Sequence, residues 1–115
     1  MPEGANKPER WPRLPLFRVQ VTGDSMAPAL RPGDRLVVWR TRRLRPGDIA
    51  VAADPRDPSR PLVKRVVSLA ADGAVLLGDN PPSSTDSRHF GPVGRERLRG
   101  RAVYRYAPSD RAGRL

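Results

Sequence analysis

The stretch Arg31-Pro32-Gly33-Asp34-Arg35-Leu36-Val37-Val38-Trp39 decides the fold class, because it joins a tight turn to a short apolar strand. The same four turn residues recur at Arg45-Pro46-Gly47-Asp48, and a second apolar run, 49–52, follows them. A central Pro-Gly pair fits a type II turn, in which proline fixes φ and glycine accepts a positive φ. Short strands separated by such turns indicate a mostly β domain.

Similar short runs continue on both sides of this stretch. We expect further strands at 17–21, 62–67, 74–77 and 101–106. Residues 25–30 lie between strands and should form a turn or a short helix. Residues 80–90 are polar and contain prolines, so they should form a long loop, the part of a β scaffold that often carries function.

The length of 115 residues is that of one domain. Residues 1–14 and 107–115 are polar and contain prolines and charged residues, so we expect them to be flexible tails. The catalytic domain should then cover residues 15–106. No run approaches the roughly 20 apolar residues of a membrane span, and the chain does not begin with a signal peptide. These features predict a soluble, cytoplasmic protein.

The net charge of +10 raises the question of an acidic partner. The basic residues are spread along the chain and aromatic residues make up only 5%, which argues against a nucleic-acid surface built on base stacking. A weak peripheral contact with an anionic membrane stays open. With no cysteine and a single histidine, the chain predicts no transition-metal site and no cofactor.

One lysine stands out among the basic residues. Of the 22 lysines and arginines, only Lys7 and Lys64 are lysines, and Lys64 lies inside an apolar run. A buried lysine can lose its proton, whereas arginine cannot. Ser25 would need a neighbouring base to act as a nucleophile, and the candidates are Lys64 and the single histidine, His89. Lysine would need its pKa lowered by roughly 3 units from about 10.4, which burial favours.

Three segments, in this order, resemble the type I signal peptidase family. Residues 23–30 resemble its serine-methionine-x-proline nucleophile box, and Lys64-Arg65 resembles its lysine box. Residues 78–88 fit its pattern GDNxxxSxDSR at every fixed position. The resemblance covers about 17–106 and implies a small signal-peptidase/LexA-like β domain of short strands with long functional loops.

The resemblance also implies roles for single residues. Ser25 would attack the scissile carbonyl, and Lys64 would take the serine proton and pass it to the leaving amine. Ser84 would hydrogen-bond the lysine nitrogen. Met26 would either line the substrate channel beside the nucleophile or simply fill the core. Four further positions would shape the loop, with the last two paired: Asp79, Asn80, Asp86 and Arg88.

Two features depart from the family pattern. The glycine-rich continuation after the lysine box is replaced by Val66-Val67-Ser68-Leu69. We also expect the protein to lack the membrane anchor and the large extra domain of the secretory enzymes. Some relatives also use a hydroxyl two residues before the nucleophile as an oxyanion donor, where this chain has Gly23. The length of this chain resembles that of the soluble members of the signal peptidase family that trim nickel-type superoxide dismutase precursors. A precursor with an extended N-terminal segment is therefore the expected partner.

Three other readings stay open. The chain could be a secretory signal peptidase without its anchor. It could also be a self-cleaving repressor-type domain, although the Ala-Gly pair at 112–113 lies in the C-terminal tail. In the third reading it is a basic binding module, in which Ser25 and Lys64 would be replaceable.

Overall fold

The two Arg-Pro-Gly-Asp turns fold as the sequence predicts. In each turn the aspartate N–H donates to the carbonyl of the first arginine at 3.0 Å. The aspartate carboxylate in turn accepts from that arginine's N–H, at 2.9 Å in the first turn and 2.8 Å in the second. Gly33 and Gly47 adopt φ values of 92° and 97°, which residues with a side chain rarely adopt. Each turn therefore delivers the chain directly into a strand.

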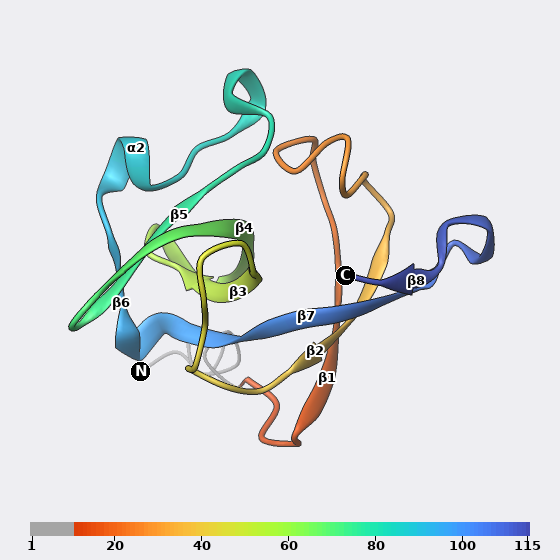
Figure 1. The fold of residues 1–115 in the computed structure, drawn as a ribbon, viewed down its shortest axis with the longest axis horizontal. Helices are drawn as coiled ribbons and strands as arrows, with labels where there is room; N and C mark the ends of the chain where they lie inside the picture. Colours follow the sequence, from red (N-terminus) through yellow and green to blue (C-terminus); the bar gives the residue numbers. More distant parts are fainter. Residues whose placement is uncertain (1–10) are drawn as a thin grey trace, which may run out of the picture.

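The computed structural model describes residues 11–115 and contains one eight-stranded antiparallel sheet (Figure 1). Along the sheet the order is β1-β2-β7-β3-β4-β5-β6, and β8 pairs with β7. The mostly β fold is thereby confirmed, and each expected strand is present. The strands are β1 (Leu16–Gln20), β2 (Arg35–Trp39), β3 (Ile49–Asp54), β4 (Asp57–Ala70), β5 (Gly73–Leu77), β6 (Val93–Gly94), β7 (Leu98–Ala107) and β8 (Gly113–Arg114).

The helical elements within the described part of the chain are all short. The expected loop over 80–90 contains η2 (Pro81–Ser83) and α2 (Ser87–Phe90), while η3 (Arg95–Arg97) and η4 (Ser109–Arg111) flank β7. Asp86 caps α2, because its carboxylate accepts from the backbone N–H of Arg88.

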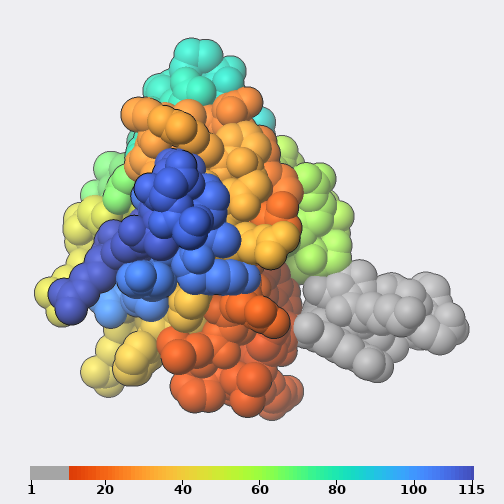
Figure 2. Space-filling view, turned by 90° about the vertical axis from the view of Figure 1, so that its right-hand side faces the viewer, coloured from red at the N-terminus to blue at the C-terminus, as the bar shows by residue number. Residues whose placement is uncertain are grey.

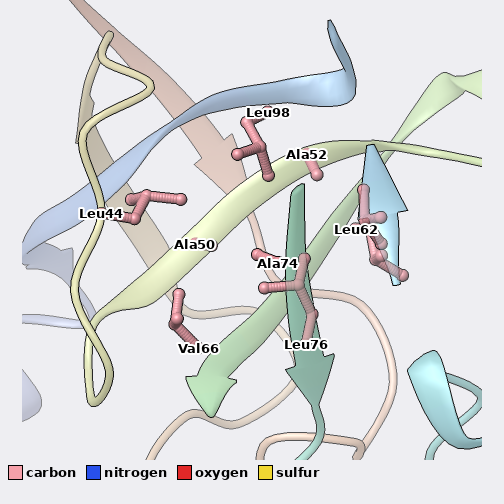
Figure 3. Close-up of a cluster of buried hydrophobic side chains, with 9 residues drawn as sticks. Leu44, Ala50, Ala52, Leu62, Val66, Ala74, Leu76 and Leu98 are labelled. Carbon is pink, nitrogen blue, oxygen red and sulfur yellow. The ribbon is translucent and has the colours of Figure 1, made fainter. Parts of the chain in front are cut away.

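The central strand β3 is buried along its whole length because it lies between β4 and β7 and packs on both faces. Ala50 and Ala52 belong to the cluster in Figure 3, whereas Ile49 packs in a second cluster. This alternation is the period of two expected of a strand. The first cluster holds Leu44, Ala50, Ala52, Leu62, Val66, Ala74, Leu76, Val93 and Leu98, and the second holds Val21, Met26, Leu30, Leu36, Ile49 and Ala102.

Residues 107–115 differ from the predicted flexible tail, because they pack on the domain. β8 pairs with β7, and the Leu115 N–H donates to the Val103 carbonyl at 3.1 Å. Arg111 also forms an ion pair with the buried carboxylate of Asp34. A buried carboxylate requires such partners, since an unpaired charge in the interior is costly.

Arg105 completes the contact between the C-terminal segment and the rest of the domain. Its guanidinium donates to Asp34 at 3.1 Å, to the Ala29 carbonyl at 2.8 Å and to the Arg111 carbonyl at 2.5 Å. Figure 2 shows the C-terminal segment, in blue, lying against the orange segment near residue 30. At the other end, the Trp11 ring packs edge-on against Phe17, and residues 1–10 of the predicted N-terminal tail lie outside the described residues.

Candidate active site

The segment that carries Ser25 connects β1 to β2. Two backbone hydrogen bonds shape it, from the Ala27 N–H to the Asp24 carbonyl at 3.1 Å and from the Leu30 N–H to the Met26 carbonyl at 2.9 Å. Met26 and Leu30 are buried in the second core cluster, so the segment is anchored on both sides of its turn. Ser25 itself is only half-buried.

The loop after β5 holds the backbone of the Ser25 segment from the other side. Asn80 donates its N–H to the Ser25 carbonyl at 2.9 Å, and its side-chain amide donates to the Asp24 carbonyl at 3.1 Å. Gly78 lies so close that a Cβ there would be 2.6 Å from the Ser25 carbonyl oxygen and 2.2 Å from Ser84 Oγ. Gly78 was not among the predicted site residues, although it is the first letter of the GDN box.

Lys64 lies on β4, where it pairs with Ala50 of β3 and is only 5% exposed. Burial lowers the pKa of its ammonium below the ordinary value of 10.5. The negative charge of Asp86 opposes this shift, whereas the positive charge of Arg56 adds to it. Within residues 11–115, Lys64 forms no ion pair that would hold its proton. This environment favours a neutral amine.

Ser25 and Lys64 line the same pocket, which has a volume of about 110 Å³. The pocket lies between residues 20–22, at the end of β1, and residues 60–64 of β4. Met26 contributes to the lining but is almost completely buried, so it serves the core as well as the pocket. Asp54 and Arg56, which form an ion pair at 2.7 Å, lie at the same pocket.

Ser84 does not make the predicted hydrogen bond to the Lys64 nitrogen. Its hydroxyl donates instead to the fully buried carboxylate of Asp86 at 2.5 Å. The same carboxylate accepts from the Gly78 N–H at 2.8 Å and from the Arg88 guanidinium at 2.6 and 3.0 Å. The expected Asp86–Arg88 ion pair is thus present. The Asp86 carboxylate, and not the Lys64 nitrogen, binds the Ser84 hydroxyl, because hydrogen bonds to a charged acceptor are the stronger ones.

The hydrogen bonds to Asp86 determine its ionisation. Burial raises the pKa of this carboxyl, but the donors on Arg88, Gly78 and Ser84 outweigh that effect and hold the pKa well below its ordinary value of 3.8. Asp86 therefore remains a carboxylate at neutral pH. Its charge raises the pKa of Lys64 and limits how far burial can lower it.

Two other polar residues of this loop lie apart from the pocket. Asp79 pairs with Arg65 at 2.7 Å, and Arg65 also donates to the Gly47 carbonyl at 3.1 Å. This contact ties the loop to β4 next to Lys64. His89 is exposed and accepts a hydrogen bond from the Asp86 N–H at 3.3 Å, and it is not among the residues that line the Ser25 pocket. The structure therefore gives no support to His89 as the base for Ser25.

A small antiparallel β domain whose pocket places a serine with a nearly buried lysine has the form of a serine peptidase. A model of the family described as Peptidase S24-like matches residues 7–96. The chain belongs to this Peptidase S24-like family, and it is a serine peptidase.

Several curated proteins are similar over most of their length. Mitochondrial ATP-independent inner membrane protease subunit 1a of Arabidopsis thaliana is 34% identical over 130 residues, covering 90% of this chain and 77% of the relative. Mitochondrial inner membrane protease subunit 1 of Xenopus tropicalis is 36% identical, covering 82% and 71%. The human subunit 1 is 31% identical, covering 84% and 73%. These matches confirm a signal-peptidase-like serine peptidase, but they do not support the narrower superoxide dismutase expectation.

The relatives also correct the predicted location. A cytoplasmic protein was expected because the sequence has no long apolar run, yet the similar proteases are named for the mitochondrial inner membrane, so that prediction is wrong. Among residues 11–115, no helix has the length and apolar character needed to cross a membrane. A long apolar run indicates how a chain is anchored in a membrane. Its absence does not determine in which compartment a peptidase works.

Proposed function

We propose that the protein is an endopeptidase with Ser25 as nucleophile and Lys64 as general base, which removes an N-terminal extension from a precursor protein. The observation that carries the proposal is the shared pocket of these two residues, together with the burial that lowers the pKa of Lys64. A serine hydroxyl needs such a neighbouring base, and a neutral amine can provide it.

The reaction proceeds in two stages. The neutral Lys64 amine accepts the Ser25 hydroxyl proton as the serine oxygen bonds to the scissile carbonyl carbon, and the Ser25 N–H stabilises the resulting oxyanion. Lys64 then donates that proton to the leaving amine as the peptide bond breaks, which leaves an ester on Ser25. In the second stage Lys64 takes a proton from water, the hydroxide attacks the ester, and the proton returns to Ser25.

Two unpaired strand edges provide a place for an extended substrate. Within residues 11–115, β1 pairs only with β2, and residues 61–64 of β4 pair only with β3. Both edges border the Ser25 pocket. A peptide can add to such an edge through its main chain while small pockets select alternate side chains. This arrangement suits an unfolded extension better than a folded surface.

We expect the rate of peptide cleavage to rise with pH along a limb set by Lys64. The base is active only when deprotonated, and burial lowers its pKa, so the midpoint of the limb in kcat/KM should lie below 10.5. The measurement is kcat/KM for a peptide substrate from neutral to alkaline pH. A profile without this limb would contradict lysine as the base.

The substrate itself is tested with two purified precursors. We propose a nickel-type superoxide dismutase precursor as the first candidate and a secretory preprotein as the second, offered with and without lipid vesicles. Cleavage of the superoxide dismutase precursor at one site, identified from the new N-terminus by mass spectrometry, supports the hypothesis that the enzyme matures this precursor. Cleavage of the second alone, only with vesicles, supports a secretory signal peptidase.

Two controls accompany this comparison. The Ser25→Ala variant should leave both precursors intact, because it lacks the nucleophile. The wild-type chain incubated alone should keep its mass, whereas shortening of the chain itself would favour the self-cleaving reading.

A further inference from the structure

One end of the domain is crowded with arginines. A pocket of about 550 Å³ is formed where residues 11–13, residues 40–43, Arg95 and residues 98–99 meet. None of the lining residues is acidic, and the basic ones are Arg13, Arg40, Arg42, Arg43, Arg95 and Arg99. We call these six arginines the basic rim.

The charges of the basic rim are only weakly balanced by the protein itself, and the carboxylate that acts on Arg99 is that of Glu96. Within residues 11–115, none of the six arginines forms an ion pair. Burial lowers the pKa of the Arg99 guanidinium, and the positive charges of Arg42 and Arg97 lower it further, while the negative charge of Glu96 opposes the shift without reversing it. Arg99 is held in place over the Trp11 ring, 5.4 Å from its centre. Like charges held this close would be stabilised by an anionic partner.

Exposed apolar side chains lie directly beside the basic rim. Leu14 is 67% exposed, Leu16 48% and Trp39 53%. Leu16 and Trp39 face each other across β1 and β2, so their side chains lie on one face of the sheet. Arg40 connects this apolar face to the rim, because its Nε donates to the Leu14 carbonyl at 3.2 Å. Arginines bordering tryptophan and leucine are typical of surfaces that bind the membrane interface.

We propose that the basic rim and this apolar face form a docking surface for an anionic lipid bilayer. The arginines lie against the lipid phosphates, while Leu14, Leu16 and Trp39 enter the headgroup region. A nucleic acid would use the charges but not the aliphatic side chains, and its binding by stacking needs a row of aromatic rings. A free phosphate ion would leave the apolar face exposed to water.

The docking surface and the Ser25 segment lie at opposite ends of the domain. In Figure 1 the segments 11–15 and 40–44 are at the bottom, and the segment between β1 and β2 is at the top. Figure 2 shows the same separation from the side. A docked enzyme thus keeps its cleavage pocket directed away from the bilayer, where a precursor segment that has left the membrane can enter.

The test is sedimentation of the full chain with vesicles of phosphatidylcholine and with an equal mixture of phosphatidylcholine and phosphatidylglycerol. We expect binding to the mixed vesicles only. The triple variant Arg13→Gln/Arg42→Gln/Arg43→Gln should lower the partition coefficient roughly 100-fold, since each basic residue at an anionic surface contributes about a factor of five. The blue shift of tryptophan emission on binding should be clearly smaller in Trp39→Phe, in which Trp11 is the remaining tryptophan.

The matched control is Arg31→Gln/Arg35→Gln/Arg114→Gln, which removes the same charge from exposed arginines outside the surface. It should retain most of the binding. Equal losses in both variants, equal binding to neutral vesicles, or binding of an RNA oligomer without binding of vesicles would each overturn the proposal. Cleavage of a soluble peptide by the first variant should be unchanged, so docking and the proposed peptidase chemistry can fail separately.

Discussion

Lys64→Arg should lower peptide cleavage by at least about 1,000-fold, the scale seen when one member of a catalytic serine-base unit is removed. Arginine keeps the positive charge and the long stem but cannot accept a proton. Lys64 is almost completely buried in β4, so the change also tests whether this site needs a base rather than a cation. The measurement is kcat with a fluorogenic peptide, beside a thermal unfolding curve for each variant.

A second variant separates lost chemistry from lost folding. Because the chain contains no cysteine, Lys64→Cys places a single thiol in the protein. Alkylation with bromoethylamine converts that thiol into an amine-bearing analogue of lysine, and we expect much of the activity to return. Full activity of Lys64→Arg, or activity in Lys64→Cys before alkylation, would show that another group is the base.

Gly78→Ala should reduce kcat by roughly 100-fold, as expected when reacting groups are displaced by about 1 Å. The new methyl group would lie 2.6 Å from the Ser25 carbonyl oxygen, which is backbone and cannot swing aside. Overpacking of this kind also costs about 1–3 kcal/mol in the free energy of unfolding. The measurements are kcat, KM and thermal unfolding.

The matched control for Gly78 is Gly113→Ala in β8. No atom lies within 4 Å of the position that its Cβ would take, so this variant should behave like the wild type. A fully active Gly78→Ala would show that the Ser25 segment can move without loss, and that contact between the two loops does not position the nucleophile.

Local patterns in the sequence were enough to predict much of this fold. The Arg-Pro-Gly-Asp turns depend on residues three apart, and the Asp86–Arg88 pair joins residues two apart. Lys64 stood out because its strand is apolar around it. These features rest on short-range physics, in which proline, glycine and alternating hydrophobicity act within a few residues.

The rest depends on contacts between distant segments. Arg105 and Arg111 reach Asp34 from 71 and 77 residues away, so the order of the C-terminal segment could not be read locally. Ser84 was expected to serve Lys64, but the fold places a buried carboxylate within reach of the same hydroxyl. The basic rim likewise combines three separate segments, whereas along the sequence the arginines only appeared evenly spread.

Among the described residues 11–115, β1 and residues 61–64 of β4 each have an unpaired edge, which exposes the free enzyme to self-association. Unpaired strand edges can join those of another copy, which is a common route to aggregation. The net charge of +10 counters this, because copies of the chain repel one another. Salt shortens the range of that repulsion to about 10 Å at 0.1 M. The arginine-rich composition therefore also protects the open edges that receive a substrate strand under the proposed function.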